Sequence, residues 1–190
     1  MSQRPPVDRQ RIEEFLLHLS QRYSRSARIY LVRGTTMVFV GFRTQTLDID
    51  LAFEVARENH GALIKAIREL KDELSLNVEE ASPGDFIPLP SGYQERSQFI
   101  GRYNQIDVFH FDLYTMALSK IERGTEEDFS DVLLLLRSGK IDFPILETCF
   151  CEILPVVGTA SLKQDPAEFR RKFDVLKQMM AQPTSSIDET

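Results

Sequence analysis

Two aspartates near residue 50 alternate with aliphatic residues. Asp48 and Asp50 lie between Leu47, Ile49 and Leu51. In a β-strand, residues two apart share a face, so the aliphatic side chains can enter a core while both carboxylates emerge together. Paired carboxylates suit Mg²⁺, which takes oxygen ligands from one or two carboxylates and from the phosphates of a substrate. The pattern therefore predicts a phosphate-handling site; the alternative is an ordinary strand whose acidic face meets solvent.

A glycine and a threonine lie upstream of these aspartates. Gly34 allows a ligand to approach the backbone closely, and the hydroxyl of Thr35 can donate to phosphate oxygens. Residues 30–32 are typical of a strand end, and residues 35–40 can begin a short helix whose N-terminal amides would face an anion. The order strand, glycine turn, helix and acidic strand favours a nucleotide site.

This order of motifs resembles the nucleotidyltransferase superfamily related to DNA polymerase β. Within it, the chain is similar to the small bacterial branch that includes the abortive-infection toxins of type IV toxin–antitoxin systems. The matching positions are Gly34, Thr35, Arg43, Thr46, Asp48 and Asp50 in the first half, and Lys120, Asp128 and Asp131 in the second. The chain departs from the family pattern at Arg33, which replaces the first glycine of a family pair. This arginine either contacts a triphosphate or fills the space that a phosphate needs.

The resemblance implies a metal-dependent transfer of a nucleoside monophosphate from an NTP to a hydroxyl acceptor, with Mg²⁺ or Mn²⁺ as the cofactor. The implied metal ligands are Asp48, Asp50 and Asp107; the implied nucleotide-binding residues are Arg33, Gly34, Thr35 and Lys120; Arg43, Thr46, Asp128 and Asp131 would support them. Asp107 would be the third carboxylate, on a neighbouring strand, that deprotonates the acceptor. A solvent-facing strand position explains Asp107 equally well. Lys120 would neutralise triphosphate charge, and Asp128 and Asp131 would orient it or pair with nearby arginines.

The composition fits one ordinary domain. The chain has 190 residues, of which 42% are hydrophobic. No apolar run approaches the ~20 residues that span a bilayer, and the first ten residues lack the hydrophobic segment of a secretory signal, so we expect a cytoplasmic protein with no membrane partner. Two cysteines, Cys149 and Cys151, are too few for a disulfide framework or a four-ligand zinc site.

The net charge of −6 argues against a general nucleic-acid binder. Its distribution is uneven, because residues 15–47 contain no Asp or Glu but include Arg22, Arg25, Arg28, Arg33 and Arg43. This positive segment either steers a triphosphate or an RNA end toward the aspartates, or closes a helix C-terminus and solvates a loop.

Hydrophobic periodicity predicts an α+β fold, with a small mixed sheet, flanking helices and a C-terminal helical extension. Helices are predicted over residues 11–23, 59–74, 111–123, 125–139, 144–154 and 165–180, strands near 28–32, 47–51, 75–80 and 105–111, and a loop over 82–93 that borders the substrate pocket. The nucleotidyltransferase-like core is expected over residues 1–137, a helical extension packed on it over 138–181, and a flexible tail over 182–190. His110 is predicted to be a packed or surface histidine.

Three classes of function stay open. The favoured one is a nucleotidyltransferase that modifies an RNA end, a protein or a small molecule, in a toxin-like role if a cognate protein partner exists. The second is a catalytically inactive nucleotide-binding or protein-interaction module of the antitoxin or partner type, which the Arg33 substitution favours. The third, a glycosidase, is disfavoured because the chain has no tryptophan to stack on a sugar and because strand-adjacent carboxylates suit a metal better.

Overall fold

A five-stranded mixed sheet forms the centre of the computed structural model, which describes residues 5–159 and 164–181. The strand order is β5-β4-β2-β7-β6. These strands are β2 (Ala27–Leu31), β4 (Ile49–Glu54), β5 (Val78–Glu80), β6 (Gln98–Tyr103) and β7 (Ile106–His110), while β1 (Val7–Asp8) and β3 (Gln45–Thr46) form a separate two-stranded ribbon. The central strand β2 runs antiparallel to β4 and parallel to β7. The predicted α+β fold is confirmed.

Helices precede, interrupt and follow the sheet. The α-helices are α1 (Arg9–Arg22), α2 (Arg33–Phe39), α3 (His60–Glu73), α4 (Tyr93–Arg96), α5 (Leu113–Arg123), α6 (Glu126–Arg137), α7 (Phe143–Ile153) and α8 (Pro166–Ala181). Short 3₁₀ turns occupy η1 (Arg57–Asn59), η2 (Pro83–Asp85) and η3 (Leu154–Val156). None of the helices in the described residues is long and apolar enough to cross a membrane.

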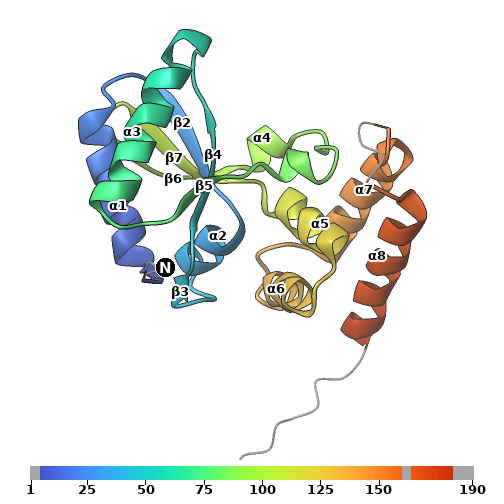
Figure 1. The fold of residues 1–190 in the computed structure, drawn as a ribbon. Coiled ribbons are helices and arrows are strands. Elements are labelled where there is room, and N and C mark those ends of the chain that lie inside the picture. The colour runs from blue at the N-terminus through green and yellow to red at the C-terminus, as the bar shows by residue number, and fades with distance from the viewer. Residues whose placement is uncertain (1–4, 160–163, 182–190) are drawn as a thin grey trace, which may run out of the picture.

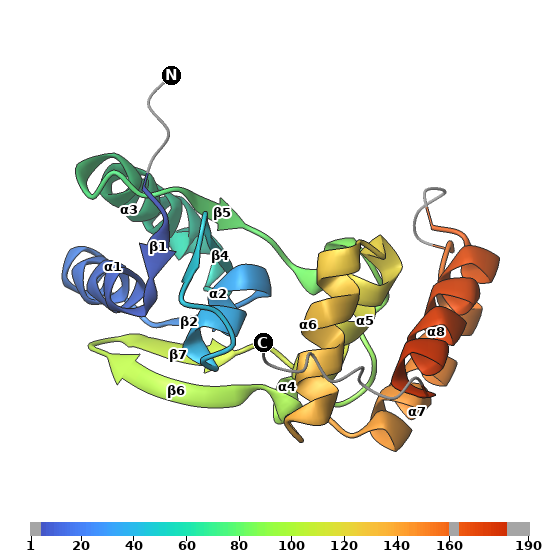
Figure 2. The ribbon, with the colours of Figure 1, turned by 90° about the horizontal axis from the view of Figure 1, so that it is seen from below.

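The two faces of the sheet enter different hydrophobic cores. Ile29 and Leu51 point into a core that they share with α1 and α3. Tyr30, which follows Ile29 on β2, faces the opposite side and joins a core built largely from α5, α6, α7 and α8. Figures 1 and 2 show α1 and α3 on one side of the sheet and the four later helices on the other. The face that carries Tyr30 is also the face of Asp50, because both alternate with residues of the first core.

The structure differs from the sequence prediction in several local features, one of which is the two-stranded ribbon of β1 and β3, which the sequence did not predict. Strand β6 was not predicted, since it is an edge strand whose register shifts between Phe99 and Gly101 and whose residues lack regular burial. The four-residue helix α4 was also not predicted. Asp48 lies in a bend before β4, not within the strand. The predicted tail over 182–190 lies outside the described residues.

His110 packs as predicted. Its ring meets Phe39 edge-on, with 6.0 Å between the ring centroids. Burial, helped by the positive charges of Lys140 and Arg9, lowers the pKa of His110 from 6.5 to about 4. The imidazole is therefore neutral at pH 7 and has a packing role.

Candidate active site

A cleft of about 440 Å³ lies between the acidic end of β4 and the helices α5 and α6. We call its first side the strand wall, which comprises Arg33, Gly34, Thr46, Leu47, Asp48, Asp50 and Glu79. The helix wall comprises Lys120, Arg123, Glu127 and Asp128, and Pro6, Arg43 and Gln45 complete the lining. Two predicted motifs that lie about 70 residues apart along the chain thus meet in one cavity.

Asp50 is the buried carboxylate of the strand wall. It lies on β4 with only 7% of its surface exposed. Its Oδ1 atom is 3.4 Å from Nη1 of Arg33. Burial raises the pKa of Asp50 from 3.8 to about 6; Arg33 opposes this rise, while the carboxylates of Asp48 and Glu79 add to it. The strand wall therefore holds more negative charge than its own cations neutralise.

A glycine turn brings α2 against the Asp48–Asp50 segment. A Cβ atom at Gly34 would lie 2.5 Å from Oγ1 of Thr46, closer than side chains approach one another, so this position needs glycine. The fully buried Thr35 hydroxyl accepts a hydrogen bond from the Asp50 amide at 2.8 Å and donates one to the Asp48 carbonyl at 3.4 Å. The structure thus places Gly34 and Thr46 on the strand wall, and uses the Thr35 hydroxyl to hold the two aspartates instead of presenting it to a phosphate.

The helix wall is a network of ion pairs around Lys120. Its Nζ donates to Asp131 Oδ2 at 2.7 Å and to Asp128 Oδ1 at 3.3 Å, and all three side chains are almost completely buried. Arg123 pairs with Asp128, and Arg43, which reaches over from the segment before β3, donates to both oxygens of Asp131 at 2.8 and 2.7 Å. An ammonium has three donors, and the residues that the structure describes accept from two of those of Lys120, which leaves one for a ligand in the cleft.

The turn between α5 and α6 creates this network. Gly124 adopts a left-handed conformation, with φ of 70°, that ends α5. Thr125 then caps α6 by accepting a hydrogen bond from the Asp128 amide at 3.1 Å. Burial favours the neutral acid at Asp128, but hydrogen bonds from Arg123 and Thr125 and the charge of Lys120 hold its pKa below the usual range. Asp128 is therefore ionised and satisfied within the protein.

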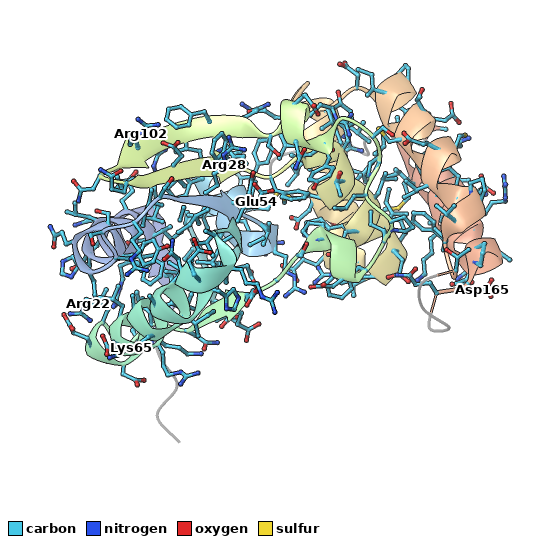
Figure 3. All side chains as sticks on the ribbon, turned by 90° about the horizontal axis from the view of Figure 1, so that it is seen from above. Arg22, Arg28, Glu54, Lys65, Arg102 and Asp165 are labelled. Atoms are coloured by element: carbon cyan, nitrogen blue, oxygen red, sulfur yellow. The ribbon has the colours of Figure 1, made fainter. Side chains whose placement is uncertain are left out.

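Asp107 lies outside the cleft. Its two oxygens accept from Nε and Nη2 of Arg102 at 2.6 and 2.9 Å on the adjacent strand β6. The sheet register places Asp107 level with Arg28, which is level with Glu54 on β4, and Figure 3 shows Arg102, Arg28 and Glu54 in a row across these strands. Asp50 lies four residues before Glu54, about 13 Å away along the strand. Asp107 shares the sheet face of Asp50 but is at the wrong level to meet it.

Glu79 is a cleft residue that the sequence reading missed. It pairs directly with Asp50 in the parallel ladder between β5 and β4, and it lines the cleft. No hydrogen bond or ion pair to its carboxylate is found among the described residues. The signal was present in the predicted strand over residues 75–80, because a residue next to the buried Val78 must point to the opposite face.

The positive segment over residues 15–47 is divided by the structure. Arg33 and Arg43 reach the cleft. Arg22 pairs with Glu73 on α3, Arg25 hydrogen-bonds Asn59, and Arg28 lies 3.8 Å from Glu54. Only two of these five arginines can therefore act on a ligand in the cleft.

The cleft residues fit a divalent cation that is shared with a substrate. Asp48 and Asp50 supply oxygen donors, and the raised pKa of Asp50 shows that this buried carboxylate lacks compensating positive charge. Among the described residues, no group of three or more His, Cys, Asp or Glu side chains is placed to hold a metal ion. Two carboxylates plus phosphate oxygens match the way Mg²⁺ is commonly held in phosphate-transfer sites.

Comparisons with known proteins agree with this geometry. No curated protein and no solved structure matches the chain. A family model described as a nucleotidyltransferase of unknown function (DUF6036) matches residues 10–182, a span that includes every residue lining the cleft apart from Pro6. The paired aspartates, the glycine turn and the helical lysine all lie within the matched residues. The chain therefore belongs to this nucleotidyltransferase family.

Proposed function

We propose that the protein transfers a nucleoside monophosphate from an NTP to a hydroxyl acceptor with the help of a divalent cation. The observation that carries this proposal is the cleft itself, in which a strand wall with excess carboxylates and a helix wall with Lys120 and Arg123 enclose one cavity. Acidic residues suit a cation, and basic residues suit phosphates. An NTP bound to Mg²⁺ or Mn²⁺ supplies both a cation for the carboxylates and phosphates for the basic residues.

Asp48 and Asp50 would hold the cation. When bound, such an ion supplies Lewis-acid stabilisation of the negative charge on the phosphates. Lys120, Arg123 and Arg33 would bind the triphosphate, and Gly34 gives it a close approach to the backbone. Asp131 accepts hydrogen bonds from both Lys120 and Arg43, and it would thereby hold Lys120 in place. We assign no step to Asp107, which is paired with Arg102 away from this cavity.

The transfer requires a base for the acceptor hydroxyl. The acceptor oxygen forms a bond to the α-phosphorus, the bond from that phosphorus to the β-phosphate bridge breaks, and pyrophosphate leaves. Glu79 is the cleft carboxylate to which the described residues offer no hydrogen bond or ion pair, and it is the candidate that takes the acceptor proton. A well-placed base of this kind contributes about 10²- to 10⁴-fold to the rate.

The acceptor classes that fit are an RNA end, a protein hydroxyl and a small molecule. A toxin-like role would add a cognate protein partner that restrains the enzyme. Labelled NTP offered with total RNA, with a protein extract and with a metabolite extract separates these classes by the fraction that takes up the label.

The first test is thermal stability with each of the four NTPs and Mg²⁺. A ligand at a hundred times its dissociation constant stabilises the native state by about 2.7 kcal/mol. We expect one or more NTPs to raise the melting midpoint in wild type and not in Asp48→Asn/Asp50→Asn. Asp107→Asn is the matched control, because it removes a carboxylate outside the cleft and should keep the shift. Equal shifts in wild type and the double variant would contradict the proposal.

The contact between Arg33 and Asp50 favours a second candidate function. An arginine that occupies a metal-binding carboxylate is also expected in a nucleotide-binding or protein-interaction module that has lost turnover. For a nucleotide-binding module, NTPs would raise the melting midpoint without transfer of label. For a protein-interaction module, no NTP would raise the melting midpoint of the wild type, and a protein partner would be the remaining ligand.

A further inference from the structure

Arg33 occupies an unusual backbone position. Its φ is 49°, in the left-handed region that costs a non-glycine residue energy. This conformation places its guanidinium in two contacts, 3.4 Å from Asp50 Oδ1 and 5.0 Å from the centre of the Phe86 ring. A strained residue at the start of α2 thus puts a cation on the buried carboxylate of the strand wall.

The backbone around Arg33 is anchored, whereas its side chain is not. Thr36 donates to the Leu31 carbonyl at 2.7 Å, and Thr35 accepts from the Asp50 amide, so α2 is tied to both flanking strands. The Arg33 side chain is 29% exposed. Its separation from Asp50 is longer than the roughly 2.7–2.9 Å of a strong charge-assisted hydrogen bond. The side chain can therefore leave Asp50 without any movement of α2.

We propose that Arg33 is an exchangeable counter-ion of Asp50. A divalent cation displaces the guanidinium from Asp50, and the guanidinium then pairs with a bound triphosphate. The proposal rests on the proposed function and adds a rule of binding to it. A cation on Asp50 would lie within a few ångströms of the guanidinium, so the two positive charges compete for one carboxylate. Phosphate oxygens offer the guanidinium a bidentate partner once it has left Asp50.

The consequence is that metal and nucleotide bind together. Without a triphosphate, the guanidinium stays on Asp50 and metal binding is weak. With one, Arg33 has a better partner and Asp50 becomes free for the metal. Such coupling is reciprocal, so the metal must strengthen nucleotide binding by the same factor, which is typically about 5- to 150-fold.

The test compares wild type with Arg33→Gln, which keeps most of the side-chain volume and removes the charge. Mn²⁺ alone is titrated without nucleotide, and bound Mn²⁺ is read by electron paramagnetic resonance. Inorganic tripolyphosphate is titrated separately in EDTA by calorimetry. We expect Arg33→Gln to bind Mn²⁺ at least about tenfold more tightly than wild type and to bind tripolyphosphate more weakly. Arg33→Lys keeps the positive charge and should retain weak Mn²⁺ binding.

Arg123→Gln is the matched control. It removes one positive charge from the same cleft, but Arg123 pairs with Asp128 on the helix wall and not with Asp50. The exchange is wrong if Mn²⁺ affinity rises equally in the two glutamine variants, or does not rise in Arg33→Gln. In either case, an NTP-dependent thermal shift in wild type would still support the proposed function. Loss of the NTP shift in wild type overturns the proposed function, and the Mn²⁺ titration alone still decides whether Arg33 and a metal compete.

Discussion

On the helix wall of the cleft, the buried ammonium of Lys120 contacts two carboxylates, Asp131 at 2.7 Å and Asp128 at 3.3 Å, and Arg43 and Arg123 complete the pairing. On the strand wall, the buried carboxylate of Asp50 has one guanidinium at 3.4 Å. Its other charged neighbours, Asp48 and Glu79, repel it. Each buried charge of the helix wall is therefore compensated inside the protein, while the strand wall is built to accept positive charge from outside.

This difference separates a wall whose buried charges are paired within the protein from a wall whose buried carboxylate is not. Breaking a fully paired buried network leaves an uncompensated charge and destabilises the fold. Neutralising an under-compensated carboxylate removes a cost that the fold already bears. Removing the buried charge of Lys120 and removing that of Asp50 should therefore change stability in opposite directions.

The largest effect is expected for Lys120→Met. The change leaves Asp128 and Asp131 buried with fewer cations, and we expect a loss of about 3–5 kcal/mol in the free energy of unfolding, measured by urea denaturation. Lys65→Met is the matched control, because Lys65 is 78% exposed and its pair with Glu69 is worth at most about 1 kcal/mol. A loss below 1 kcal/mol for Lys120→Met would show that the helix wall does not depend on this ammonium.

Asp50→Asn should have the opposite sign at pH 8. The folded pKa of about 6 lies above the ordinary value of 3.8, and each pH unit corresponds to about 1.4 kcal/mol, so ionising Asp50 costs the fold up to about 3 kcal/mol. We expect the variant to be more stable than wild type by about 1–3 kcal/mol in urea denaturation at pH 8. Glu80→Gln, an exposed neighbour on β5, should change little.

The pH dependence of this difference checks its cause. Because the folded pKa is raised, the stability from protonated Asp50 is fully present below about pH 3.8 and is lost as the pH rises through about 6. Wild type and Asp50→Asn should therefore converge as the pH falls from about 6 to about 4. A difference that stays constant over this range would assign the effect to packing and not to charge.

Gly34→Ala tests how tightly the strand wall is assembled. The new Cβ would lie 2.5 Å from Thr46 Oγ1, and we expect a loss of about 1–3 kcal/mol in the free energy of unfolding. Thr46→Ala in the same chain removes that oxygen and should recover part of the loss. Gly61→Ala, in α3 with open space around it, should be neutral or stabilising by up to about 1 kcal/mol. If Gly34→Ala and Gly61→Ala changed the free energy of unfolding equally, the clash with Thr46 would not explain the need for glycine at residue 34.

Asp107→Asn should give the smallest effect. Asp107 pairs with Arg102, whose side chain is 68% exposed, and such surface pairs contribute about 0–1 kcal/mol. We expect an unchanged NTP-dependent thermal shift and a stability within about 1 kcal/mol of wild type. An abolished nucleotide shift would bring Asp107 back into the site and weaken the case for Glu79.

Local patterns were enough to predict the main elements of the fold. The amphipathic repeats that give α1, α3 and α5 to α8, and the alternation around Asp50, depend on neighbours within a few residues. The same holds for Gly34, because a glycine between a strand and a helix signals a close backbone approach. Edge strand β6 escaped prediction because its register shift breaks that alternation.

Which carboxylate joins Asp50 was decided by strand pairing. Asp107 and Glu79 both lie on strands of the same sheet and look alike in sequence, but the register brings Glu79 level with Asp50 and leaves Asp107 level with Glu54. Register depends on contacts between distant segments, which single-strand periodicity does not contain.

The sequence by itself determined the types of charge in the cleft, and the tertiary structure decided how they are paired. Asp50, Lys120 and Arg33 can all be recognised as candidates from their motifs. In the described part of the chain, Lys120 is paired with Asp128 and Asp131, while Asp50 has a single cation, Arg33; both follow from how α5 and α6 pack and how α2 meets β4. The physical reason is that burial and the distance between charges set the energy of each group, and both exist only once the chain has folded.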